Sequence, residues 1–107
     1  MANTYKNASL VDVPTSATTL YTAPALTTSI VKSIYCSNTT ASDTTVTVTV
    51  REQGGNTASI VTAAALPANS SLQIIDGTLV LEAADAIQVT AGNATTIDVI
   101  AAVLEIS

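Results

Sequence analysis

The chain has 107 residues, the size of a single domain, and its eight acidic and three basic residues give a net charge of -5. A chain of this length buries roughly 65% of its unfolded surface, enough for one core, and three scattered basic residues cannot neutralise a run of phosphates, so nucleic-acid binding is not expected. Histidine, phenylalanine and tryptophan are absent, which removes the commonest general base and two large aromatic anchors.

The N-terminal segment differs in composition from the rest of the chain. Residues 1–9 have few apolar side chains apart from Tyr5 and two alanines. We therefore expect an N-terminal arm that becomes ordered only against a neighbour, followed by one domain over residues 10–107. Within that domain, a short strand is predicted at residues 10–13, before Pro14, and another at residues 18–22, before Pro24.

The strongest strand signal is the alternation of threonine and valine over residues 44–51. Successive side chains of a strand point to opposite faces, so Val46, Val48 and Val50 share one face and the intervening threonines share the other. This period is typical of a half-buried strand and cannot form a single helical stripe.

Further β-rich runs follow, separated by turn residues at intervals of roughly ten residues. They cover residues 27–37, 58–65, 71–75, 78–81, 87–90 and 95–106. Among the turns, Asp76-Gly77 is a strong two-residue hairpin signal and predicts that the flanking runs form part of a meander.

The final run, residues 95–106, is apolar on both faces. One face carries Ile97, Val99, Ala101 and Val103, and the other carries Ile100, Ala102, Leu104 and Ile106. Such a strand needs cover on both faces, so we expect surplus apolar surface that a partner chain covers. The candidate oligomer or shell contacts are Ile100, Leu104 and Ile106, with Tyr5 and Lys6 of the arm.

These patterns together define the fold class. About eight or nine short antiparallel strands without a convincing helical period predict an all-β, two-sheet β-sandwich, either jelly-roll-like or immunoglobulin-like. A closed small barrel is the alternative architecture, because side-chain alternation is the same in both.

The sequence offers little for catalysis or metal binding. No histidine is present to activate the many hydroxyls, so we predict that the chain is not an enzyme. Glu82 and Asp85, with Asp76 upstream, could in principle act as an acid/base pair or hold Ca²⁺, but their spacing matches no calcium loop and favours solvated turn acids. We predict no catalytic residue, cofactor or metal, and we interpret the lone Cys36 as a small core residue.

Export and membrane signals are also missing from the pattern. No apolar run approaches the length of a membrane span, and residues 1–6 lack the basic opening and apolar stretch of a signal peptide. We therefore expect no membrane partner and assembly in a cytoplasm.

Four stretches of the chain form a pattern through their order and spacing. They are residues 19–24 (TLYTAP), 28–38 (TSIVKSIYCSN), 66–72 (LPANSSL) and 79–87 (LVLEAADAI). In this pattern the chain resembles small virion structural proteins of tailed bacteriophages, and the resemblance covers most of the chain from Thr18 to Val89.

The resemblance implies a function. Similar proteins act as capsid decoration or cement subunits, commonly as trimers, while others sit on tails or fibres. The resemblance implies that this chain is a virion protein on the capsid surface, assembled in the host cytoplasm. It further implies that the chain binds the major capsid protein and associates as a homotrimer. The alternative is a tail, baseplate or fibre-associated module that recognises a host surface. An unrelated adhesion or pilus-type subunit is a further rival, and it predicts export.

Overall fold

The computed structural model describes residues 3–75 and 78–106 of the chain, and these residues form strands and loops without a helix. The strands are β1 (Asn3–Leu10), β2 (Thr18–Thr22), β3 (Thr28–Asn38), β4 (Thr44–Arg51), β5 (Thr57–Leu66), β6 (Ser71–Gln73), β7 (Leu79–Leu81), β8 (Ala86–Ala91) and β9 (Ile97–Ile106). No helix in this described part is long and apolar enough to cross a membrane.

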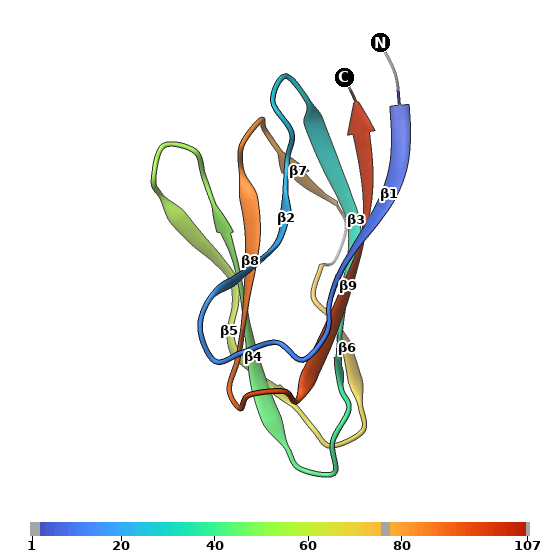
Figure 1. Cartoon of the computed structure of the whole chain (residues 1–107), viewed down its shortest axis with the longest axis vertical. Coiled ribbons are helices and arrows are strands. Elements are labelled where there is room, and N and C mark those ends of the chain that lie inside the picture. The colour runs from blue at the N-terminus through green and yellow to red at the C-terminus, as the bar shows by residue number, and fades with distance from the viewer. Residues whose placement is uncertain (1–2, 76–77, 107) are drawn as a thin grey trace.

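The strands form two antiparallel sheets that pack face to face as the two layers in Figure 1. The five-stranded sheet has the order β1-β9-β3, with β6 and β7 both on the far side of β3, and the four-stranded sheet has the order β2-β8-β4-β5. No ladder joins the two sheets among the described residues. The predicted two-sheet β-sandwich is therefore confirmed, and the closed barrel is not formed.

The core lies between the sheets and contains aliphatic side chains. Val46 and Val48 of β4 are fully buried and Val50 is nearly so, while the threonines between them are partly exposed. In β9, which is apolar on both faces, the face turned to the core carries Ile97, Val99, Ala101 and Val103. The alternation read from the sequence thus separates the two faces of both strands correctly, because an extended backbone sends neighbouring side chains to opposite sides.

The N-terminal segment is a strand rather than a free arm. Asn3–Leu10 pairs with β9 in an unbroken register from Asn3 opposite Ile106 to Leu10 opposite Val99. The predicted strand at residues 10–13 is wrong, because the chain bends after Leu10 and Asp12 has a φ of 56°. Polar composition alone suggested an arm, but the backbone groups of β1 pair with those of β9, and this pairing does not depend on apolar side chains.

The predicted meander is also wrong. The Asp76-Gly77 turn lies outside the described residues, but β6 and β7 do not pair with each other. Instead, both pair with β3, with β6 against Tyr35–Ser37 and β7 against Ser29–Val31. The 11-residue strand β3 is long enough to hold two three-residue strands in succession along one side.

The sandwich predicts different costs for the same substitution on its two sides. Ile87→Ala should lower the free energy of unfolding by about 2–5 kcal/mol, because it leaves a cavity in the core. Ile100→Ala is the matched control: Ile87 is fully buried, whereas Ile100 is 47% exposed, and its change should stay below about 1 kcal/mol. Urea denaturation of both variants checks this, and equal costs would contradict the assignment of inner and outer faces.

Candidate interaction surfaces

The outer face of the five-stranded sheet carries a row of apolar side chains that crosses four strands. Tyr5 of β1 lies opposite Leu104 of β9, Leu104 lies opposite Ile30 of β3, and Ile30 lies opposite Val80 of β7. Opposed residues in a sheet share a face, so these four side chains are neighbours in space although they are far apart in the sequence. Tyr5 is 78% exposed and Val80 is 57% exposed.

A second apolar pair lies further along the same face. Ile100 of β9 is opposite Tyr35 of β3, and both are nearly half exposed. Between the two rows, Ala102 leaves a shallow hollow of about 270 Å³, which Tyr35 and Ile100 line together with Asn7 and Ser33. We call this surface the apolar face; it consists of Tyr5, Ile30, Tyr35, Val80, Ile100 and Leu104.

The structure brings four of the five predicted contact residues onto one face. Tyr5, Ile100 and Leu104 belong to the apolar face, and Ile106 continues the same side of β9. Lys6 is different, because it lies opposite Val103, whose side chain is buried in the core. Tyr35, Ile30 and Val80 were not predicted, since nothing in their own strands reveals which residues of the neighbouring strands they meet.

Lys6 belongs to a polar network at one end of the sandwich, and its own side chain is 52% exposed. Its Nζ lies 3.3 Å from Oε1 of Glu105, and the hydroxyl of Tyr21 donates a hydrogen bond to Oε2 of the same carboxylate. The Tyr21 hydroxyl is also 2.8 Å from Oγ of Ser29. Tyr21 comes from β2 in the other sheet, so the network ties the two layers together and satisfies a carboxylate that is only 8% exposed.

The network shifts the titration of its acidic members. The hydrogen bond from Tyr21 lowers the pKa of Glu105 below its ordinary value of 4.5; burial acts in the opposite direction, and Lys6 lowers the pKa further. Burial, and then the bond to Glu105, raises the pKa of Tyr21 to about 12. The carboxylate is therefore held ionised and the phenol neutral, as their hydrogen bond requires.

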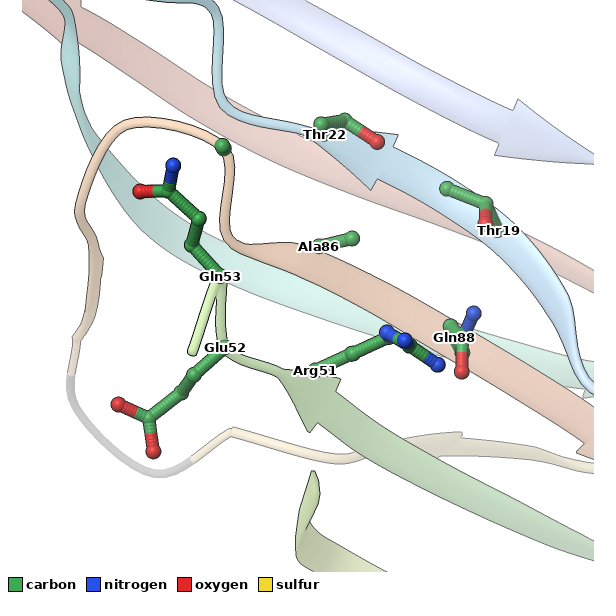
Figure 2. Close-up of a pocket in the computed structure, with 8 residues that line it drawn as sticks. Thr19, Thr22, Arg51, Glu52, Gln53, Ala86 and Gln88 are labelled. Carbon is green, nitrogen blue, oxygen red and sulfur yellow. The ribbon is translucent and has the colours of Figure 1, made fainter. Parts of the chain in front are cut away.

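The outer face of the four-stranded sheet is polar. Thr47 lies opposite Thr90, and Thr49 lies opposite Gln88, so the threonine side of β4 continues onto β8. At the end of β4, Arg51 borders a hollow of about 400 Å³ (Figure 2). We call this the Arg51 hollow; it is lined by Thr19, Thr22, Arg51, Glu52, Gln53, Ala84, Ala86 and Gln88.

The register of three strands explains the shape of this hollow. Ala86 of β8 lies between Thr22 of β2 and Arg51 of β4. Because its side chain is small, the surface is depressed at this position and forms the floor of the hollow. Figure 2 shows the Arg51 side chain extending along the sheet toward Gln88, which in turn lies opposite Thr19. This site was not predicted from the sequence, because its members come from separate strands and the turn after β4.

Asp85 holds the rim of the hollow in place. Its Oδ1 accepts a hydrogen bond from the backbone N–H of Gln53 at 3.1 Å, and its Oδ2 accepts one from the N–H of Glu82 at 3.0 Å. Asp85 is 9% exposed, so this carboxylate joins two turns instead of facing a substrate. Asp76, the third acid considered from the sequence, lies outside the described residues.

The lone cysteine lies in the core, as predicted. Cys36 is fully buried in β3, and burial raises the pKa of its thiol to about 12. A thiol in this state is a poor nucleophile, since the thiolate is the reactive form.

Comparison with known proteins bears on the fold. No protein-family model matches the sequence, and no curated protein matches it. Among solved structures, the chain is similar to one from Bacillus endospore appendages, which are described as a family of disulfide-linked pili. The TM-score is 0.59 at 13% identity, and the match covers 98% of this chain and 88% of that chain. At this identity, the similarity shows a shared fold.

The Glu105 network predicts loss of stability in acid. Because folding lowers the pKa of Glu105, its stabilising contribution is complete above the unfolded-state value of about 4.5 and disappears as the pH falls through the folded-state pKa. Melting temperatures of the native chain and of Glu105→Gln, measured from about pH 7 to about pH 3, should therefore converge at the acidic end.

The matched control for this measurement is Glu82→Gln, which removes the same charge from an exposed side chain. Its melting curve should run nearly parallel to that of the native chain over the whole pH range. A constant difference between the native chain and Glu105→Gln, with no convergence in acid, would contradict a role for the ionised carboxylate.

Proposed function

We propose that the chain is a non-enzymatic structural subunit of a tailed bacteriophage particle, a decoration or cement protein that binds the outer capsid shell. The observation that carries the proposal is the apolar face, where side chains from β1, β9, β3 and β7 form one exposed surface. Exposed contiguous apolar surface on a small soluble domain marks an interaction site. The resemblance of residues 18–89 to phage virion proteins supplies the partner, the major capsid protein.

The two outer faces of the sandwich differ in a way that suits a subunit at a surface. The apolar face includes Tyr5, 78% exposed, and Val80, 57% exposed, whereas the face around Thr47 and Thr49 is polar and interacts well with water. A subunit seated through the apolar face would direct the threonine face outward. Burial of apolar area contributes about 25 cal/mol per Å², so this side is the one that gains from contact.

A cement protein would stabilise the shell by shifting the assembly equilibrium. A protein that binds the assembled shell, and not the separate shell subunits, shifts the equilibrium toward assembly. In this proposal the chain associates as a homotrimer, joins neighbouring shell subunits on the capsid surface, and assembles in the host cytoplasm. A position on a tail, baseplate or fibre, with host recognition as the role, is the alternative within the phage particle.

A second candidate function is a pilus-type subunit. The fold similarity to a chain of Bacillus endospore appendages favours it. A stable sandwich that presents a contact surface suits both a pilus subunit and a capsid decoration. The two roles differ in the partner that the contact surface binds. In a filament the partner is another copy of the same chain, and on a shell it is a different protein.

Copy number separates these candidates. We expect quantitative mass spectrometry of purified particles to find this chain in a ratio to the major shell protein near that of a lattice-wide decoration, because only the lattice offers so many equivalent sites. A count of a few copies per particle would move the chain to a vertex, tail or fibre. Its presence in filaments and not in particles would favour the pilus candidate.

Substitution on the apolar face should abolish docking. Leu104→Asp places a charge at the centre of the surface and should weaken binding to particles by at least about a hundredfold, because that charge would be buried without a partner. Thr47→Asp on the opposite face is the matched control and should bind normally. Co-sedimentation of each variant with particles lacking the native chain measures this, and equal binding by both variants would overturn the proposed docking face.

Self-association is a separate prediction. Sedimentation of the purified chain should show a trimer at high concentration. A monomer at every concentration would refute the trimer. Shell binding would then still be tested by the co-sedimentation of Leu104→Asp and Thr47→Asp.

A further inference from the structure

We infer that the Arg51 hollow binds a saccharide that carries a carboxylate, with the Arg51 guanidinium as the partner of the carboxylate. This binding would be independent of the particle on which the chain sits and of the apolar face. The hollow opens on the polar outer face of β2, β8 and β4, which belongs to the opposite sheet from the apolar face.

The hollow has the size and the composition of a site for a small hydrophilic ligand. Its volume of about 400 Å³ lies within the range of about 300–1,000 Å³ seen for ligand pockets. Only Ala84 and Ala86 contribute apolar side chains. An apolar anchor, such as the side chain of a bound protein, would therefore find no pocket to fill here.

The polar groups of the hollow are available to a ligand. Within residues 3–75 and 78–106, the side chains of Thr19, Thr22, Arg51, Glu52, Gln53 and Gln88 take part in none of the protein's hydrogen bonds or salt bridges. Figure 2 shows Glu52 directed away from Arg51, so the guanidinium is not neutralised by its neighbour in the chain. Amide and hydroxyl groups of this kind match the vicinal hydroxyls of a sugar ring.

Charge selects the type of saccharide. Arg51 is the one basic residue in the lining, and a guanidinium binds a carboxylate through two parallel hydrogen bonds. Glu52 at the rim and the net charge of -5 disfavour ligands with several negative charges. No aromatic side chain lines the hollow, so a neutral sugar lacks a stacking surface and the carboxylate must supply the extra affinity.

The floor and rim of the hollow are preorganised for ligand binding. Gln88 and Ala86 lie in β8, which is paired on both sides by β2 and β4. Asp85 fixes the backbone of Gln53 at the rim. Preorganised groups lose little conformational entropy on binding, which helps a small ligand. Strand addition by a peptide is disfavoured here, because the neighbouring edge strand β2 is five residues long and its register shifts between Thr19 and Tyr21.

Titration of the isolated chain with D-glucuronate tests this site. Amide chemical shifts of Gln53, Ala86 and Gln88 should move and saturate, with a dissociation constant of about 1 mM, as expected for a ligand of this size. D-glucose and acetate serve as the two half-ligand probes, and each should bind at least about tenfold more weakly than glucuronate. If acetate binds as tightly as glucuronate, the proposal that the hollow recognises the sugar ring is wrong. If glucose binds as tightly as glucuronate, the proposal that the hollow recognises the carboxylate is wrong.

Two variants make the assignment specific. Arg51→Gln should weaken glucuronate binding at least about tenfold, whereas Lys32→Gln, which removes the same charge from an exposed position in the other sheet, should leave it unchanged. Unchanged shifts of the Ile87 and Val89 amides would show that Arg51→Gln keeps the fold. Absence of saturable shifts in the native chain, or equal weakening by both variants, would overturn the site. Because the isolated chain is used, failure here leaves the capsid proposal standing, and failure of particle binding leaves this site standing.

Discussion

The structure depends on one constraint, which is that β9 is hydrogen-bonded on both sides and buried on one face. Its backbone pairs with β1 and with β3 along nearly its whole length, while Ile97, Val99 and Val103 fill the space between the sheets. With the inner side committed to the core, the remaining apolar side chains of β9 must lie on the outer side of the sheet. The apolar face is a direct consequence of this arrangement.

The apolar face and the Glu105 network are stabilised by different interactions. The apolar face gains free energy from excluding water, whereas the Glu105 network joins the two layers through hydrogen bonds to a carboxylate that is only 8% exposed. Lys6 shows how the two are separated: it is the neighbour of Tyr5 in β1, but its side chain pairs inward with Glu105. One strand thus supplies a contact residue and a residue that supports the fold.

Prediction from the sequence succeeded where the signal was local. The strand at residues 18–22 and the strand at residues 44–51 have the bounds expected from their patterns, because alternation and turn residues act within a few positions. Prediction failed for β1, whose polar sequence lacks the alternation of a half-buried strand. For β6 and β7 the strands were predicted but their pairing was not, because their partner β3 lies more than 30 residues earlier in the chain. Four of five contact residues shared a face because a single strand, β9, contributed three of them.

The sequence by itself determined that the chain is all-β, that the valine side of β4 enters the core and which residues of β9 share a side, since the direction of a side chain follows from its own extended backbone. Only the strand pairing decided that the strands form two separate sheets of a sandwich and not a closed barrel. Only the tertiary structure decided that Tyr5, Leu104 and Ile30 form one row and that Arg51 and Gln88 border one hollow. These neighbours are set by strand order and register, which arise from contacts between segments far apart in the chain.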